Sequence, residues 1–161
     1  PAIDKSVSID NLIPEKKLKC TKVKHEPGGG GINVSRVIKR LGGETNALFL
    51  GGGYNGTLME ELLKKENVKS TLINCKNNTR ENLIVYDEKS TLQYRFGMPS
   101  ETIFENEWME LISFLKNYKD VNYWVISGST PESIPKSTID NILNIANENK
   151  KYVEKDSKYS A

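Results

Sequence analysis

The sequence contains few of the residues on which disulfide scaffolds, metal centres and membrane anchors depend. Its 161 residues include two cysteines, Cys20 and Cys75, and one histidine, His25. Two cysteines are too few for a disulfide framework or a cysteine-based zinc site, and one histidine excludes a multi-histidine metal centre. No apolar run approaches the roughly 20 residues of a membrane span, and no signal peptide opens the sequence. We therefore expect a cytoplasmic protein with reduced thiols and no membrane partner.

An excess of charge of either sign is also lacking. The 23 Lys and Arg residues nearly balance the 21 Asp and Glu residues, and the net charge is +2. A nucleic-acid partner held by a broad basic face is therefore not expected. Hydrophobic residues make up 37% of the chain, which is low for a self-contained domain. The chain starts without an initiator methionine and ends on a polar stretch, so we expect both ends to have been cut from a larger domain.

The spacing of apolar residues predicts strands and helices that alternate. We expect strands over residues 17–25, 46–50, 68–74, 123–127 and 151–155, and helices over 33–41, around 58–63, and over 105–118 and 136–149. This alternation is typical of βαβ units and a mainly parallel sheet. A hairpin of residues 82–87 and 91–96 interrupts it, and residues 1–8 are expected to form a loop.

Two glycine-rich segments are the most informative motifs. In EPGGGGIN, residues 26–33, four glycines let backbone amides approach a ligand at the start of a helix, although a plain turn capped by Asn33 explains the composition equally well. The segment GGGYNG, residues 51–56, fits the dinucleotide pattern G-x-G-x-x-G. The acid which that pattern requires after the next strand is replaced by residues 74–76, NCK. We favour tight strand-to-helix packing there over a nicotinamide site.

Several polar residues have a binding interpretation and a plainer one. Asp4 is expected at the carboxyl end of a strand, where a carboxylate can accept two sugar hydroxyls, but it could be a solvated loop residue. The hairpin is flanked by Arg80 and Arg95, whose guanidinium groups suit phosphate but are also common on surfaces. The same two interpretations apply to Lys17 and Lys19.

Together these segments resemble the PfkB branch of the ribokinase-like carbohydrate kinases. The matching segments are PAIDKS, KLKCTKVKHEPGGGGINVSR, LGG, TRENLIVYDE, QYRFGMP and WVISGSTP. They extend in order through essentially all 161 residues. Within that family, the sequence is most similar to the minor bacterial type of 6-phosphofructokinase.

The resemblance implies an α/β fold, a three-layer α/β/α ribokinase-like sandwich with a small β-sheet lid from residues about 9–26 and 80–97. Residues 1–161 would be the N-terminal part of a single kinase domain. The family has an Asn and a full first strand before the position of Pro1. It also has a later half with an N-x-x-E segment for the metal and a G-A-G-D loop with the catalytic base. The family segment V-D-[ST]-S-G has a remnant here at Asp156 and Ser157.

The resemblance also implies roles for individual residues. Sugar-phosphate binding falls on Asp4, Gly28, Gly29, Asn33, Arg80 and Ser129. Lid contacts to phosphate, across a homodimer formed through the lid, fall on Lys17, Lys19 and Arg95. ATP and Mg²⁺ are implied as cofactors with their sites mostly outside this chain, and no catalytic or metal-binding residue is expected within it.

The expected activity is ATP-dependent phosphorylation of a sugar phosphate, with fructose 6-phosphate as the first candidate substrate and this chain as the sugar-phosphate-binding half. On its own the chain is expected to be inactive. The alternatives are a 1-phosphofructokinase, a tagatose-6-phosphate kinase, a non-catalytic sugar-phosphate-binding module, and a nicotinamide-dependent enzyme that uses residues 51–56.

Overall fold

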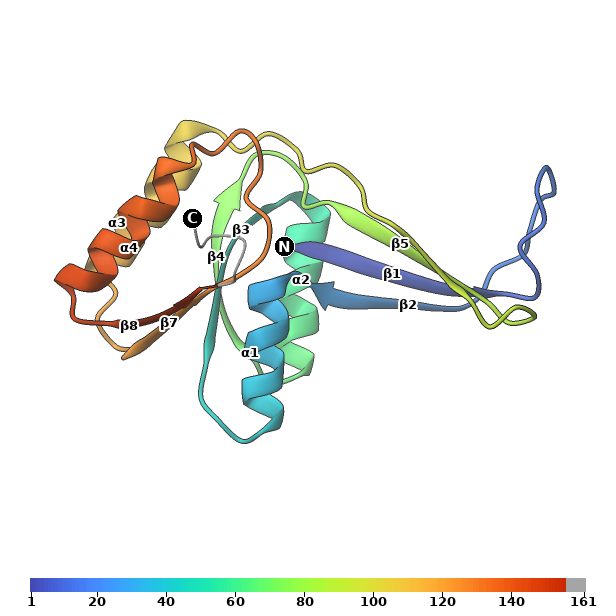
Figure 1. The fold of residues 1–161 in the computed structure, drawn as a ribbon, viewed down its shortest axis with the longest axis horizontal. Coiled ribbons are helices and arrows are strands. Elements are labelled where there is room, and N and C mark those ends of the chain that lie inside the picture. Colours follow the sequence, from blue (N-terminus) through green and yellow to red (C-terminus); the bar gives the residue numbers. More distant parts are fainter. Residues whose placement is uncertain (156–161) are drawn as a thin grey trace.

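Short strands and helices alternate along the chain (Figure 1). The computed structural model describes residues 1–155, so Asp156 and Ser157 lie outside the described residues. The strands are β1 (Ala2–Ile9), β2 (Thr21–Gly28), β3 (Asn46–Gly52), β4 (Lys69–Cys75), β5 (Glu81–Asp87), β6 (Gln93–Phe96), β7 (Tyr123–Ile126) and β8 (Tyr152–Lys155). The helices are α1 (Gly30–Arg40), α2 (Gly53–Lys65), α3 (Glu105–Asn117) and α4 (Ser137–Glu148).

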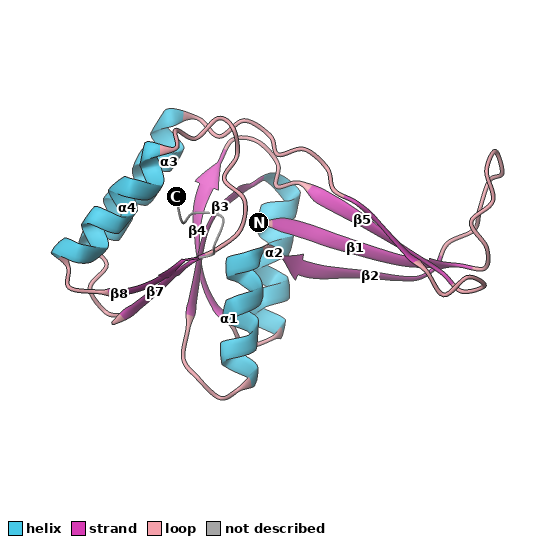
Figure 2. Ribbon diagram, viewed as in Figure 1, coloured by secondary structure: helices cyan, strands magenta, loops and turns pink. Residues whose placement is uncertain are grey.

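Two pairs of parallel strands confirm the predicted βαβ units. Strand β3 runs parallel to β4, and β7 runs parallel to β8. Helix α2 connects the first pair and α4 the second, because parallel neighbours need a crossover that returns the chain to the same end of the sheet. The β3–β4 pair lies between α1 and α2 on one side and α3 on the other (Figure 2). This arrangement gives the expected α/β/α layers.

A separate four-stranded sheet extends away from these layers (Figure 1). Its strand order is β2-β1-β5-β6. Strand β1 pairs antiparallel with β2 and parallel with β5, and the predicted hairpin is β5 and β6. We call these four strands the outlying sheet.

The expectation of a loop over residues 1–8 is wrong, because Ala2–Ile9 form the inner strand β1 of the outlying sheet. Its apolar and polar residues alternate only weakly, and what fixes it as a strand is pairing on both edges with segments distant in sequence. The strand expected over residues 17–25 begins later, at Thr21, and continues to Gly28. Lys17 and Lys19 therefore lie in the connection between β1 and β2.

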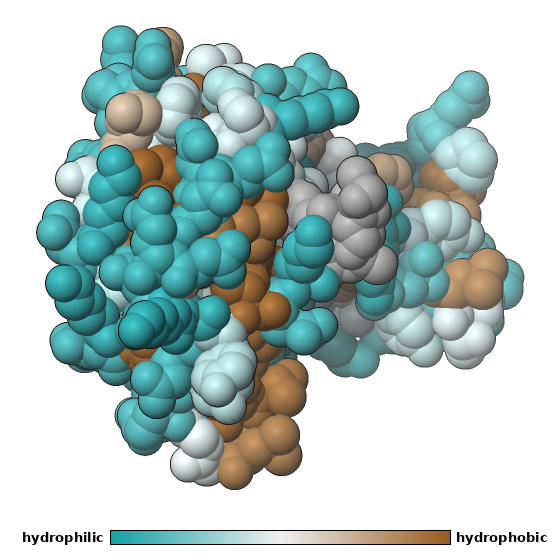
Figure 3. Space-filling view, turned by 60° about the vertical axis from the view of Figure 1, so that its left-hand side comes forward, coloured by the Kyte–Doolittle hydropathy of each residue, from teal (hydrophilic) through white to brown (hydrophobic). Residues whose placement is uncertain are grey.

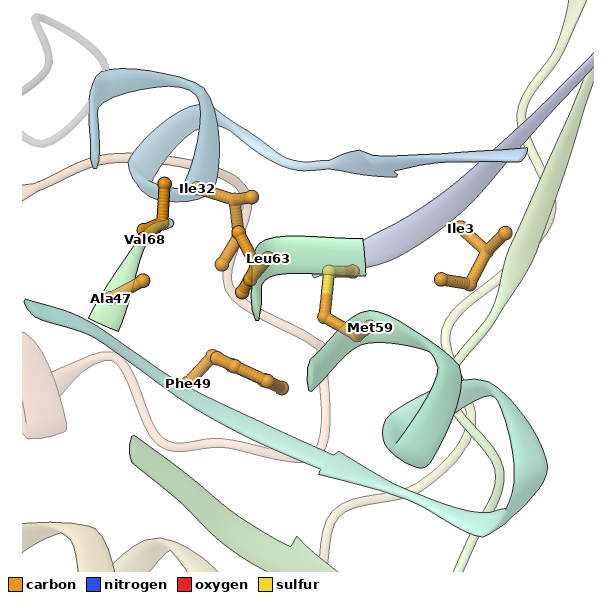
Figure 4. Packing of buried hydrophobic residues seen from close by; sticks show 7 residues of the cluster. All are labelled: Ile3, Ile32, Ala47, Phe49, Met59, Leu63 and Val68. Carbon is orange, nitrogen blue, oxygen red and sulfur yellow. The ribbon is translucent and has the colours of Figure 1, made fainter. Parts of the chain in front are cut away.

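Two apolar clusters hold the layers together. The first joins the start of β1 to α1, β3 and α2 (Figure 4), and its buried members are Ile3, Ile32, Ala47, Phe49, Met59, Leu63 and Val68. Met59 and Leu63 have no exposed surface, and burial of such a side chain contributes about 1.5–3 kcal/mol. The second cluster packs α3 and α4 against β7 around Trp124 and Ile142. The first cluster therefore ties the start of β1 to the layers.

A cleft lies between strands β3 and β7. Within the described residues β3 and β7 belong to different sheets, and the space between them has a volume of about 960 Å³. Its walls include Phe49 from β3 and Trp124 from β7. The face shown in Figure 3 has a continuous band of apolar surface between polar regions.

No helix in residues 1–155 is long and apolar enough to cross a membrane.

Candidate functional site

The carboxylate of Asp4 lies where the outlying sheet meets the layers. In the strand register Asp4 is opposite Asn82 of β5 and Glu26 of β2. Asn82 donates from its side-chain nitrogen to Oδ1 of Asp4 at 2.9 Å. The structure therefore places Asp4 inside a strand, not at a strand end as the sequence suggested, and fixes its carboxylate through one oxygen.

Gly28, the last residue of β2, provides the room that this carboxylate occupies. A Cβ atom on Gly28 would overlap the Asp4 carboxyl group, at 2.5 Å from its Cγ. The next residue, Gly29, has a φ of +118°, a backbone conformation that residues with a side chain rarely adopt. Gly29 is the N-cap of α1, and no side chain caps the helix there. The first backbone amides of α1 therefore face this region with the positive end of the helix dipole.

The loop that follows β7 packs directly on the start of α1. A Cβ atom on Gly30 would overlap Oγ of Ser127 and lie 2.8 Å from the backbone nitrogen of Gly128. Exposed Ser129 lines the mouth of the cleft together with Gly29 and Arg80. The structure thus brings the end of β2, the start of α1 and the loop after β7 to one place.

Arg80 supplies positive charge near the start of β1. Its backbone oxygen accepts a hydrogen bond from the Ile3 amide at 2.9 Å, and its side chain donates to the Met98 carbonyl at 3.2 Å. The Nε atom is buried with no hydrogen-bond partner among residues 1–155. A buried unpaired donor on a cationic side chain is a feature that suits an anion.

Asn33 lies one turn into α1 and is exposed. Its backbone amide donates to the Gly29 carbonyl at 2.9 Å, and its side-chain oxygen accepts from Arg36 at 3.3 Å. Two residues of this neighbourhood, Asn82 and Arg36, were missed by sequence reasoning. Asn82 becomes identifiable only from its register opposite Asp4, and Arg36 only from the partners described below.

The three residues assigned to lid contacts are not part of this cluster. Lys17 and Lys19 are exposed in the β1–β2 connection, which Figure 1 shows at the end of the outlying sheet far from Pro1. Arg95 is exposed on the edge strand β6, where it donates to Gln93 at 2.9 Å. It is opposite Ile84, which is opposite Ser6. Because directly paired residues share a face of a sheet, Arg95 lies on the same face as Asp4.

The second glycine-rich segment is filled by protein. A Cβ atom on Gly52 would overlap the Cys75 carbonyl and lie 2.5 Å from the Asn77 carbonyl. The side-chain oxygen of Asn78 accepts from the Asn55 amide at 3.0 Å at the start of α2. A pyrophosphate has no room where these groups lie. The geometry supports the tight-packing interpretation of residues 51–56.

The described residues contain no cluster of side chains that fits Mg²⁺. Across residues 1–155, no three His, Cys, Asp or Glu side chains gather in an arrangement that could hold a metal ion. We assign no residue of this chain to Mg²⁺ or ATP and derive no chemical step through either.

The layers and the glycine-rich turn at the start of α1 define an α/β protein. Residues 2–161 match the model of the pfkB family carbohydrate kinases, and the chain belongs to this family.

Relatives and solved structures support the same fold. One relative is the ATP-dependent 6-phosphofructokinase isozyme 2 of Escherichia coli, to which the chain is 38% identical. The match covers 91% of this chain and 47% of the relative. It is 29% identical to the D-tagatose-1-phosphate kinase of Bacillus licheniformis over 92% of its length and 48% of the relative. A crystal structure of Escherichia coli phosphofructokinase-2 in complex with fructose-6-phosphate matches with a TM-score of 0.90 and 36% identity, covering 96% of this chain and 51% of that one. The fold is ribokinase-like, and the chain spans about half the length of the relatives it matches.

Proposed function

We propose that this chain supplies the sugar-phosphate-binding half of an ATP-dependent sugar-phosphate kinase, with fructose 6-phosphate as the first candidate substrate. The observation that carries the proposal is the arrangement at the end of β2. Asp4 is held by Asn82 over Gly28, next to Arg80 with a buried unpaired Nε.

Each group in this arrangement has a chemical part to play. The carboxylate of Asp4 keeps one oxygen free of Asn82, which contacts Oδ1. That oxygen can accept hydrogen bonds from sugar hydroxyl groups. The Arg80 guanidinium and the first amides of α1 suit a phosphate group. Ser129 lies at the mouth of the same cleft, where its hydroxyl can contact the ligand.

A homodimer formed through the outlying sheet is part of the proposal. On one face of that sheet Phe96 is opposite Leu83, and Tyr94 is opposite Val85. Phe96 is 46% exposed, and a second copy would cover this apolar face. Because Lys17 and Lys19 are remote from Asp4 in one chain, we expect them to contact phosphate only across such a dimer.

The test is a titration of the 161-residue chain, followed by nuclear magnetic resonance. Fructose 6-phosphate, fructose 1-phosphate, tagatose 6-phosphate and unphosphorylated fructose are compared. We expect weak saturable binding of a sugar phosphate that perturbs the amides of Gly28 and Gly29, no comparable effect of fructose, and no ADP release in a coupled assay. Turnover by the chain alone would overturn its assignment as a binding half.

A non-catalytic module that binds a sugar phosphate is the second candidate. Sedimentation analysis separates the two. A monodisperse dimer that binds sugar phosphate would favour the module, whereas aggregation would favour a kinase half that needs further sequence.

A further inference from the structure

The guanidinium group of Arg36 is nearly buried and fully engaged by protein. Arg36 follows Asn33 by one turn of α1, and its side chain is 11% exposed. Its Nε donates to both carboxylate oxygens of Glu66, at 3.0 and 2.9 Å, and a terminal nitrogen donates to Oε1 at 2.7 Å. This paired geometry is the strong form of an arginine–carboxylate contact. The Glu66 contact raises the pKa of Arg36 above its ordinary value, so the group stays charged.

The other terminal nitrogen of Arg36 reaches the glycine-rich segment. It donates to the Pro27 carbonyl at 2.9 Å and to Oδ1 of Asn33 at 3.3 Å. Pro27 immediately precedes Gly28, whose missing side chain makes room for the Asp4 carboxylate. One guanidinium therefore links the end of α2, the end of β2 and the first turn of α1.

This contact also determines the orientation of the Asn33 amide. A guanidinium can only donate hydrogen bonds, so the amide must present its oxygen to Arg36 and its nitrogen elsewhere. Within residues 1–155 that amide nitrogen has no hydrogen-bond partner, and Asn33 is exposed. The amide nitrogen is therefore left available as a donor to a ligand.

We infer that Arg36 is a positioning residue: it holds the Pro27–Gly28 turn and the Asn33 amide in the arrangement that receives the ligand, without touching the ligand itself. The inference rests on the proposed function for the identity of the ligand, a sugar phosphate. The positioning of the turn does not depend on that identity.

The chain contains a matched control in Arg40. Arg40 also donates to Glu66, at 3.0 Å, but its side chain is 63% exposed and it contacts neither Pro27 nor Asn33. The substitution Arg36→Lys keeps the charge but loses the planar fork that joins four partners, Glu66, Pro27, Asn33 and, at 3.5 Å, Glu26. Arg40→Lys makes the same chemical change at a site where only the Glu66 contact is affected.

The first measurement needs no ligand. The backbone amide of Asn33 donates to the Gly29 carbonyl, and that of Asn149 in the distant α4 region donates to Ile145 at 3.0 Å. In Arg36→Lys we expect the Asn33 amide to exchange its hydrogen about tenfold faster, with Asn149 within about twofold of wild type. Arg40→Lys should leave both within about twofold. Equal behaviour of the two variants at Asn33 would overturn the inference.

The second measurement is the dissociation constant for fructose 6-phosphate. In the wild-type background we expect Arg36→Lys to weaken binding about tenfold. When Asn33 is already alanine, we expect the same substitution to weaken binding less than about threefold, because Arg36 acts on the ligand through the Asn33 amide. A tenfold weakening by Arg36→Lys in the Asn33→Ala background would overturn the role of Arg36 at Asn33. Faster exchange at Asn33 with no binding of any sugar phosphate would support the positioning role and overturn the proposed function.

Discussion

The substitution Gly28→Ala tests the contact on which the candidate site depends. The added Cβ would lie 2.5 Å from Cγ and 2.9 Å from Oδ1 of Asp4, closer than nonbonded carbon and oxygen atoms approach. Either the carboxylate rotates away from Asn82 or β1 and β2 separate. Overpacking of this kind costs about 1–3 kcal/mol. Alanine in place of glycine within a strand returns roughly 0.5–1 kcal/mol, so we expect a net loss of about 0.5–2 kcal/mol in the free energy of unfolding.

The same substitution should weaken ligand binding. A hydrogen bond to a charged group contributes about 1.5–3 kcal/mol, so a displaced Asp4 carboxylate would weaken fructose 6-phosphate binding about 10- to 100-fold. The control is Gly31→Ala in the same glycine run. Its Cβ would lie 3.5 Å from the Ser127 carbonyl, an ordinary contact, and alanine inside α1 should stabilise the helix by up to about 1 kcal/mol.

Urea unfolding followed by circular dichroism gives the stabilities, and magnetic resonance titration gives the affinities. The decisive comparison is Gly28→Ala in the wild-type and Asp4→Ala backgrounds. If the carboxylate causes the clash, removing it should recover most of the stability that Gly28→Ala loses. An equal loss in both backgrounds, or a Gly28→Ala variant as stable as Gly31→Ala, would refute this account of the site.

Three further predictions concern other groups. Burial raises the pKa of Cys75 to about 11, so at pH 8 about one Cys75 thiol in a thousand is ionised. A disulfide reagent should therefore modify exposed Cys20 quickly and Cys75 far more slowly. Equal rates would contradict the burial of Cys75. The Arg36 hydrogen bond lowers the pKa of Glu66 below 4.5, so wild type should be more stable than Glu66→Gln above that pH and lose its advantage as the pH falls through the lowered pKa. Urea midpoints at pH 7 and pH 3 measure this, and an unchanged difference at pH 3 would speak against it. Arg80→Gln should weaken fructose 6-phosphate binding about tenfold and leave unfolding nearly unchanged, because within residues 1–155 the guanidinium gives up one hydrogen bond, to the Met98 carbonyl. An unaltered affinity would remove Arg80 from the site.

Local patterns in the sequence were enough to predict the βαβ units, whereas the three layers were expected from the family resemblance. The helix after Asn33 and the strand from residue 46 have strong apolar periodicity and glycines at their ends, and both are present. The β5–β6 hairpin was also predictable, because its two apolar runs are separated by a short polar turn. Strand β1 was not, because its apolar positions are irregular. It is a strand through its partners in β2 and β5, and those pairings are long-range.

The same distinction applies to the candidate site. Asp4 and Asn82 are 78 residues apart, and Arg36 and Glu66 are 30 apart. Nothing in the local composition of either member identifies its partner. The sequence therefore indicated which residue types were available for a sugar phosphate, whereas the strand register determined which of them meet. Local composition gave Arg80 and Arg95 the same two interpretations, but the strand order places Arg95 on the edge strand β6.

The run of four glycines, residues 28–31, shows how a motif combines unrelated constraints. Gly28 is required by the space that the Asp4 carboxylate occupies, Gly29 by a positive φ, and Gly30 by the close approach of Ser127. Gly31 meets none of these constraints, because a Cβ there would make only an ordinary contact. Three steric requirements from three different elements therefore converge on consecutive residues. That convergence, more than the flexibility of glycine, explains why the turn into α1 needs this sequence.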